Sequence, residues 1–318
     1  MSRARLPLVY NPGSGLRPMD PDALLARLDP ELRDRLQPIP LRLPFDYAPV
    51  IELAQAAGGP LLVWGGDGTI HHAGRALLAA GCPVALGAVP GGSGNGLVGG
   101  LRTPLDPAGA VARLLEGRDL AMDLGRLDGE PFFNLCGTGF EAMVAHAFAG
   151  GQGRGFRNYA SQSFRLWRTQ PALPLRWQTE PGPRPEPAGR IDRLRAAWRG
   201  PEAELPAQAW SLCFANLPQY GSGLWIAPGA DPTDGCLTWV GLDRPGLWSM
   251  LTQVPQLFRE RGRTSLRREG RILRAVVSLD QPWPWHLDGE PVAARDRAEL
   301  TVEKGAFRMR VSSECPWH

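Results

Sequence analysis

The sequence contains almost no lysine. Lys304 is the single lysine among 35 basic residues, and the remainder are arginines. A phosphate held by a basic side chain in this protein is therefore expected to be held by arginine. The Walker-type loop G-x-x-x-x-G-K-[ST], which depends on a lysine, is absent. This absence excludes a nucleotide site of the P-loop type and leaves other glycine-rich phosphate sites open.

Paired cysteines and long apolar runs are also missing. The five cysteines are widely spaced and include no C-x-x-C pair, so nothing indicates a zinc site or a disulfide framework. No stretch reaches the ~18 apolar residues of a membrane span, and the N-terminus lacks the apolar segment of a signal peptide. We therefore expect a cytoplasmic protein with reduced thiols. The cysteines are Cys82, Cys136, Cys213, Cys236 and Cys315.

The composition is that of a globular protein. The chain has 318 residues, 43% of them hydrophobic, which is enough for about two domains with substantial cores. The formal net charge of +3 is too small to indicate a nucleic-acid partner, and we expect none. Residues 151–200 are locally basic, with ten arginines against three acids. Anionic membrane surfaces attract such segments, although a solvated arginine-rich face explains the pattern almost as well.

The first part of the chain alternates apolar runs with segments of helical spacing. This alternation predicts an α/β domain over residues 1–124, with a mostly parallel sheet covered by helices. In such sheets ligands bind at the carboxyl ends of the strands. The expected strands are 6–10, 39–43, 61–64 and 84–89, and the expected helices are 20–36, 47–57 and 70–80.

The remainder, residues 125–318, predicts a second domain that is mainly β and sandwich-like. Its short apolar runs are separated by turn residues, and the pentapeptide LDGEP occurs twice, at 127–131 and 287–291. Both copies read as hairpins that turn at Asp-Gly. Residues 156–169 have the spacing of an amphipathic helix, and the polar segment 181–208 reads as a surface excursion.

Three glycine-rich loops follow expected strands of the first domain: NPGSG at 11–15, GGDGT at 65–69 and PGGSGNG at 90–96. Backbone amides freed by glycine, next to a helix N-terminus, favour a phosphate group. Asp67 in the second loop is suited to orienting a magnesium ion, although each loop alone is also explained as a turn. The third loop also matches G-x-G-x-x-G weakly, because it follows the fourth strand rather than the first.

Taken in order, these motifs resemble the catalytic domain of the diacylglycerol kinase, sphingosine kinase and ceramide kinase superfamily. Later segments agree with this resemblance: FFNLCGTGFEAMVA at 132–145, GSGLWIAPGADPTDGCL at 221–237 and LDGEP at 287–291. The resemblance implies a lipid kinase that uses ATP and Mg²⁺, with an α/β nucleotide domain and a β-rich lipid domain. The site is expected in the cleft between the two domains.

The resemblance also implies roles for individual residues. Glu290, the acid of the late DGE, is the expected general base, and Asp67 belongs to the Mg–ATP network. A structural magnesium would use Asp234, with Asp231 and Cys236 as carbonyl donors. Residues expected to bind the nucleotide or its phosphates are Asn11, Gly65, Gly66, Asp67, Gly68, Thr69, Ile70, His71, Gly92, Ser93, Asn95 and Arg157.

Several positions depart from the family pattern. After GGDGT the family often has an acid where this chain has His72, which we interpret as a helix surface residue. No threonine occurs near residue 41, where many bacterial members contact the nucleotide. Met143 and Ala145 stand where sphingosine kinases have acids that would pair with a sphingoid amine. These substitutions favour a neutral, diacylglycerol-like lipid.

The expected partners are a lipid substrate and the inner face of a membrane, which the protein would touch from the cytoplasm. A homodimer stays open. Two alternatives also stay open: an NAD kinase, which shares GGDGT, and a catalytically weak lipid-binding or regulatory protein on the same fold. The chain has no counterpart of the other sequence blocks of NAD kinases, whereas PGGSGN and the late DGE fit lipid kinases. His72 and the missing threonine are the features that favour the regulatory alternative.

Overall fold

Four short strands near the start of the chain line up in parallel. In the computed structural model β1 (Leu6–Tyr10) pairs with β2 (Leu36–Pro40) and β3 (Leu61–Gly65), and β3 pairs with β4 (Leu86–Pro90). Their carboxyl ends therefore meet at one edge of the sheet, and all three glycine-rich loops start there. The structure describes residues 4–15, 18–42, 45–149, 164–183 and 205–318.

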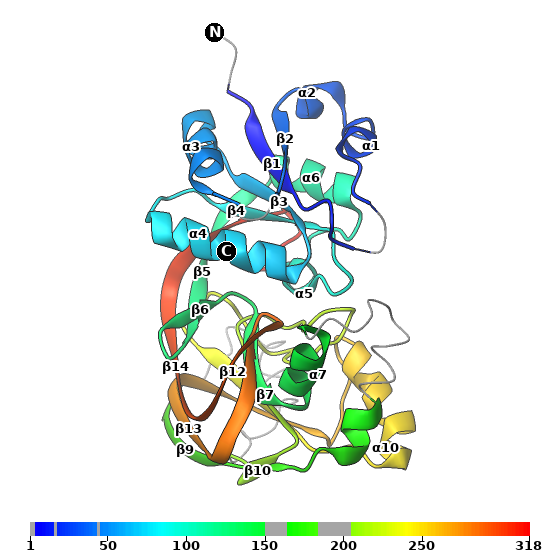
Figure 1. The fold of residues 1–318 in the computed structure, drawn as a ribbon, viewed down its shortest axis with the longest axis vertical. Helices are drawn as coiled ribbons and strands as arrows, with labels where there is room; N and C mark the ends of the chain where they lie inside the picture. Colours follow the sequence, from blue (N-terminus) through cyan, green and yellow to red (C-terminus); the bar gives the residue numbers. More distant parts are fainter. Residues whose placement is uncertain (1–3, 16–17, 43–44, 150–163, 184–204) are drawn as a thin grey trace, which may run out of the picture.

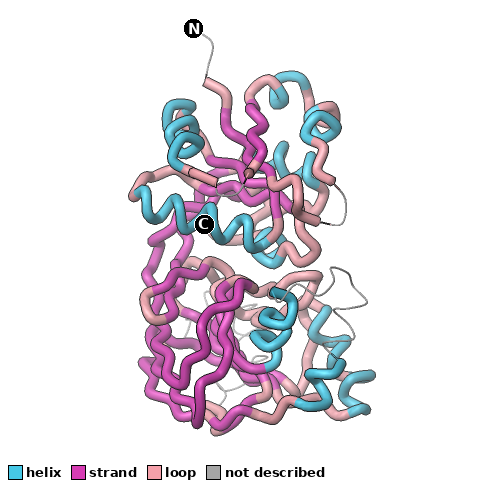
Figure 2. Tube along the Cα trace, viewed as in Figure 1, coloured by secondary structure: helices cyan, strands magenta, loops and turns pink. Residues whose placement is uncertain are grey.

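Helices cover both faces of this parallel sheet, because both faces are apolar. In β3, Leu61 and Val63 pack in the core on one face, and Leu62 and Trp64 pack in the core on the other. Figure 2 shows the helices gathered around these strands. The first face is covered by α3 (Ala48–Ala57) and α4 (Asp67–Ala80); α1 (Pro21–Leu25) and α6 (Pro107–Glu116) contribute to the second core, and the short helices α2 (Pro30–Arg33) and α5 (Gly96–Gly100) complete the lobe.

The second lobe is built mainly of antiparallel strands and lies below the first in Figure 1. Two long strands, β13 (Arg267–Leu287) and β14 (Glu290–Val311), run through it and pair with each other. The other elements of this part are β5 (Arg118–Leu127), β6 (Glu130–Phe132), β7 (Leu135–Gly139), α7 (Phe140–Ala149), β8 (Leu173–Pro174), β9 (Arg176–Pro181), β10 (Gln208–Ala209), β11 (Ser211–Ala215), β12 (Leu237–Leu242), α10 (Leu247–Thr252) and the 3₁₀ helix η1 (Val254–Phe258).

Strand β14 joins the two lobes into one continuous sheet. Near its C-terminal end Met309 and Arg310 pair in parallel with Leu86 and Gly87 of β4. Met309 is buried in the core of the first lobe together with neighbouring residues of β14. The predicted boundary between residues 124 and 125 lies inside β5, which also pairs with β14 along most of its length. The C-terminal end of the chain thus returns to complete the first lobe.

The predicted fold class is confirmed, with differences in detail. The helix expected over 20–36 is two short helices instead, because the position before Pro30 disfavours the helical backbone. The second strand begins at Leu36 rather than residue 39, and it tolerates Pro38 and Pro40 because it lies at the edge of the sheet. Within the helix predicted over 156–169, the described residues 164–169 are helical.

Both LDGEP copies form the predicted hairpin turns. Asp128 and Gly129 have φ values of 49° and 85°, and Asp288 and Gly289 have 51° and 89°. Positive φ at both central residues is the backbone of a type I′ turn, which suits Asp-Gly. The first turn joins β5 to β6, and the second joins β13 to β14. No described helix is long and apolar enough to cross a membrane.

Candidate active site

The three glycine-rich loops touch one another at the carboxyl edge of the parallel sheet. The backbone amide of Gly66 donates to Ser14 Oγ (3.0 Å), and Ser14 Oγ donates to the carbonyl of Gly91 (3.2 Å). A Cβ on Gly92 would lie 2.6 Å from the Cα of Gly66, so only glycine allows this approach. Residues from sequence positions 14, 66 and 91 therefore form one surface rich in backbone amides.

Two asparagines fix the shape of these loops. Asn11 donates from Nδ2 to Thr69 Oγ1 (3.0 Å) and accepts from the amide of Gly13 (3.1 Å). Asn95 accepts from the amide of Gly92 (2.9 Å) and donates back to its carbonyl (2.8 Å), with its own φ at 51°. Both side chains thus hold the backbone of these loops in place.

The Asp67 carboxylate is turned toward the third loop. Its Oδ1 accepts from the amide of Gly96 at 2.8 Å. Burial raises the pKa of Asp67 to about 6, even though amide donors from Gly96 and Leu97 favour the charged form. The negative charge of Asp288 contributes a further, smaller rise in this pKa. A nearby cation would relieve this cost, so the site suits the carboxylate's expected place in a Mg–ATP network.

A buried carboxylate, Asp288, ties the second lobe to helix α4. It accepts from the backbone amides of Phe133 (2.9 Å), Asn134 (2.8 Å) and Leu135 (3.0 Å), and it lies 2.8 Å from His71 Nδ1. His71 is therefore engaged in the contact between lobes. Its exposed neighbour in the chain, His72, instead lines the cavity described next.

Glu290 is the first residue of β14, and its side chain contacts the GGDGT loop at the start of helix α4. A Cβ on Gly68 would overlap its Oε1, so the carboxylate occupies the space that a larger residue would fill. Glu290 shares a cavity of about 620 Å³ with Asn11 and Thr69. The structure thus brings the expected base and part of the expected nucleotide site together. The remaining lining residues are Gly13, Ser14, Leu41, Phe45, Tyr47, Gly66, Gly68 and His72.

Two aromatic residues also line this cavity, and the sequence motifs did not indicate them. Phe45 and Tyr47 pack edge to face, with ring centroids 4.8 Å apart and an interplanar angle of 77°. Burial raises the pKa of Tyr47 to about 12, so this phenol stays neutral. The two aromatic residues follow the expected second strand, at the same sheet edge as the loops. That position is the signal from which they could have been found.

Other expected nucleotide residues lie elsewhere. Ser93 and Asn95 line a second cavity of about 650 Å³, which does not include Asn11 or Glu290. Ile70 is buried in the core of the first lobe, so only its backbone is available to a ligand. Arg157 lies outside the described residues.

The expected metal residues form a turn that is held by other charges. Asp234 pairs with Arg271, and its Oδ1 accepts from the amide of Cys236 at 2.8 Å. Asp231 caps its own turn by accepting from Thr233. Because the Asp234 carboxylate already faces a guanidinium, a cation there would require Arg271 to move. No group of three or more metal-ligating side chains occurs among the described residues.

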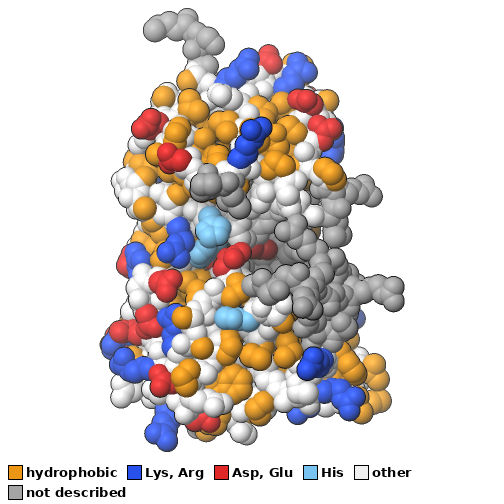
Figure 3. All heavy atoms as spheres, viewed as in Figure 1, with side chains coloured by type: hydrophobic (Ala, Val, Ile, Leu, Met, Phe, Trp, Pro, Cys, Tyr) orange, Lys and Arg blue, Asp and Glu red, His pale blue; other side chains and the backbone are white. Residues whose placement is uncertain are grey.

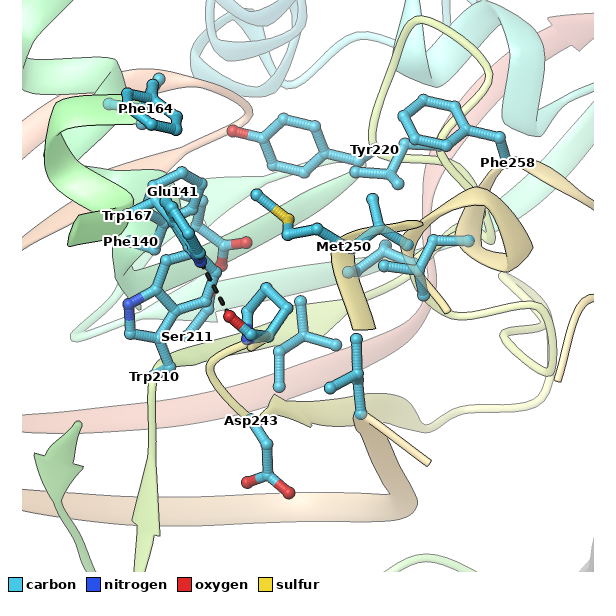
Figure 4. Close-up of a pocket in the computed structure, with 18 residues that line it drawn as sticks. Phe140, Glu141, Phe164, Trp167, Trp210, Ser211, Tyr220, Asp243, Met250 and Phe258 are labelled. Carbon is cyan, nitrogen blue, oxygen red and sulfur yellow. Dashed lines mark hydrogen bonds between the residues drawn. The ribbon is translucent and has the colours of Figure 1, made fainter. Parts of the chain in front are cut away.

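A third cavity, of about 370 Å³, lies inside the second lobe (Figure 4). Its wall is mostly aromatic and aliphatic, with contributions from α7, α10 and η1. Figure 4 shows the carboxylate of Glu141 directed into this cavity. Glu141 is 9% exposed, its Oε1 has no hydrogen-bond partner, and the nearest base, His286 Nε2, lies 3.7 Å away. An acid therefore does line this cavity, although it stands two residues before Met143, where sphingosine kinases have an acid.

Comparison with known proteins agrees with the motifs. Residues 5–127 match the family described as "Diacylglycerol kinase catalytic domain". A probable lipid kinase YegS-like from Pseudomonas fluorescens is 27% identical over 276 residues, covering 85% of this chain and 84% of that protein. A diacylglycerol kinase from Mycobacterium tuberculosis is 28% identical over 208 residues, covering 63% of this chain and 60% of that protein.

Solved structures support the fold. The crystal structure of a putative diacylglycerol kinase from Bacillus anthracis has a TM-score of 0.68 at 15% identity and covers 98% of both chains. A second diacylglycerol kinase structure from the same organism has a TM-score of 0.65 at 14% identity. The family match and the names of these relatives confirm the resemblance inferred from the motifs and indicate a lipid kinase.

The Asp288 contact predicts an asymmetry between the two LDGEP copies. Asp288→Ala leaves three buried amides unpaired, and we expect it to lower the free energy of unfolding by about 3 kcal/mol or more. Asp128→Ala is the matched control, because Asp128 lies in the other LDGEP turn and accepts from Glu299 N and Arg295 in an exposed setting. It should cost about 1 kcal/mol in urea titrations. Equal losses would contradict the proposed importance of Asp288.

Proposed function

Because residues 5–127 match the diacylglycerol kinase catalytic domain, we propose that this protein transfers the γ-phosphoryl group of Mg–ATP to a lipid hydroxyl. The observation that carries the proposal is the position of Glu290 against Gly68, in a cavity shared with Asn11 and Thr69. Phosphoryl transfer depends mainly on positioning and on charge stabilisation, with one group to take the acceptor's proton. All three requirements have candidates at this edge of the sheet.

The nucleotide would lie along the touching loops. The amides of Gly68 and Thr69, in the first turn of helix α4, would donate to phosphate oxygens, because the first amides of a helix have no acceptor within the helix. The nucleobase would lie toward the wall of the cavity formed by Leu41, Phe45 and Tyr47. When bound, Mg²⁺ would neutralise charge on the phosphates, and Asp67 is the residue of this chain suited to hold it.

Glu290 would act on the acceptor. Its carboxylate takes the proton of the lipid hydroxyl as the oxygen forms a bond to the γ-phosphorus, and the bond from that phosphorus to the bridging oxygen breaks. ADP leaves with the bridging oxygen. The products are ADP and a phosphorylated lipid, and Glu290 returns its proton to water.

We propose a diacylglycerol-like acceptor, with its apolar part in the cavity of the second lobe. That cavity, at about 370 Å³, falls within the roughly 300–1,000 Å³ typical of small-molecule sites. The lipid-kinase names of the relatives support this reading over an NAD kinase. The expected location at the inner face of a membrane follows from a lipid acceptor and is a proposal in the same sense.

The two LDGEP copies test the proposed base. Glu290→Gln should slow turnover by about 10²–10⁴-fold, with nucleotide binding little changed, because a base typically contributes that factor. The matched control is Glu130→Gln, since Glu130 follows the other turn and lies near Arg75 (3.6 Å) and Arg295 (3.8 Å). It should keep turnover near that of the unmodified protein.

The assay uses radiolabelled ATP with diacylglycerol, monoacylglycerol, phosphatidylglycerol, ceramide and sphingosine in mixed micelles. Diacylglycerol should accept phosphate best. Phosphorylation of none of these lipids would overturn the kinase proposal and favour the regulatory alternative. Equal effects of the two Gln substitutions would mean that the base lies elsewhere.

The pKa of Asp67 predicts how magnesium dependence changes with pH. Since this pKa is raised to about 6, Asp67 binds a proton in the folded protein over a range where an ordinary carboxyl is already ionised. A cation needs the ionised form, so apparent Mg²⁺ affinity should fall about tenfold between pH 7 and pH 5. Asp67→Asn should flatten this dependence and lower turnover. A magnesium affinity that is independent of pH over this range, measured by titrating Mg²⁺ in the kinase assay, would contradict the role.

A further inference from the structure

Helix α10 exposes apolar side chains that no described residue covers. Leu247, Trp248 and Leu251 have 77%, 76% and 73% of their surface exposed, the three highest values among large hydrophobic residues of the described chain. Spacings of one and four residues place them on one side of the helix. No residue of α10 is buried. Together with Phe164 and Phe258, which are also more than half exposed, they form what we call the apolar patch.

The apolar patch is continuous with the cavity of the second lobe. Phe164 and Phe258 belong to the patch and also line the cavity, so the cavity opens to the surface between them. Met250 lies on the same helix as the exposed residues but lines the cavity (Figure 4). Helix α10 therefore has one side toward the cavity and another without a partner.

One residue of the cavity wall also contacts the first lobe. Tyr220 lines the cavity, and its backbone carbonyl lies so close to Gly96 that a Cβ there would overlap it. Gly96 is the first residue of α5, and its amide donates to Asp67. Tyr220 therefore connects the wall of the cavity with the loop that contacts Asp67.

The two segments that carry the apolar patch also expose several arginines. The segment 164–169 and the segment 243–263 contain two acids, Asp243 and Glu260, and these pair with Arg268 and Arg102. In Figure 3 hydrophobic side chains gather beside Lys and Arg side chains at the lower right, where Figure 1 has α10. The exposed basic residues of the two segments are Arg165, Arg168, Arg244, Arg259, Arg261 and Arg263.

We propose that the apolar patch and its arginines dock on an anionic lipid bilayer, so that the lipid acceptor enters the cavity directly from the membrane. The proposal rests on the kinase function proposed above. An exposed Trp beside Leu on a short helix, with exposed arginines nearby, matches the chemistry of a bilayer interface, where apolar side chains insert and arginines meet lipid phosphates. The open cavity behind the patch distinguishes this surface from one that only binds another protein.

Vesicle binding tests the surface without depending on turnover. The combined variant Leu247→Ser, Trp248→Gln and Leu251→Ser should bind vesicles of phosphatidylcholine and phosphatidylglycerol at least about tenfold more weakly in co-flotation, since each large side chain contributes to insertion. It should melt like the unmodified protein because these residues are exposed. Leu251→Ser alone is matched with Leu273→Ser, a partly exposed leucine on β13 that lies outside the patch and should change nothing.

The arginines supply a second arm. Arg259→Gln with Arg261→Gln should weaken binding to anionic vesicles and reduce its dependence on salt, because fewer charges are screened. Vesicle binding that survives in the combined variant would overturn the proposal. The same holds for a wild-type dimer that the combined variant converts to a monomer without losing vesicle binding, since the patch would then join two copies of the chain.

A soluble substrate separates this proposal from the kinase function. With a short-chain diacylglycerol free in solution, the combined variant should turn over as the unmodified protein does, while its activity on vesicles falls. If the unmodified protein binds vesicles but phosphorylates no lipid, and the combined variant binds vesicles more weakly, the docking surface is supported and the kinase function is overturned. If it phosphorylates diacylglycerol and both proteins bind vesicles equally, the kinase function stands and the docking surface is overturned.

Discussion

The arrangement of the whole site depends on the buried carboxylate of Asp288. It is held by three consecutive amides of the second lobe and by His71 of helix α4, all within 3.0 Å. Because Asp288 is the turn residue of the β13–β14 hairpin, the contact fixes that hairpin against α4. Glu290 follows two residues later, and its carboxylate contacts Gly68. A structural hydrogen-bond network thereby positions the proposed base.

Helix α4 serves both lobes at once. It begins in the loop proposed to bind phosphates, and the side that faces the second lobe contacts it at Gly68, His71 and Gly74. At Gly74 a Cβ would lie 2.5 Å from the ring of Phe133, so the helix can approach the second lobe only with glycine there. Residues spaced by three lie on the same side of a helix, which explains how one element makes all these contacts. The GGDGT loop and the second lobe are thus mechanically connected through one helix.

Much of this organisation could be predicted from local sequence patterns, and some could not. The order of NPGSG, GGDGT and PGGSGNG indicated three loops at one sheet edge, and Asp-Gly indicated both hairpins, because short-range backbone chemistry decides these features. The return of β14 to β4 joins residues 309 and 86, and no local pattern encodes such a pairing. Asp288 was overlooked for the same reason, since its partners are distant in the sequence. Arg271 opposite Asp234 is a third example, and it bears on the expected metal site.

Glycine at position 68 leaves the space that the Glu290 carboxylate occupies, and this contact holds the proposed base in place. A double-mutant cycle on turnover with Gly68→Ala and Glu290→Gln tests it most directly. Gly68→Ala should slow turnover in the unmodified background by displacing the carboxylate, and it should add little once Glu290→Gln has removed the base. Full multiplication of the two effects would contradict the claim, because Gly68 would then act independently of Glu290.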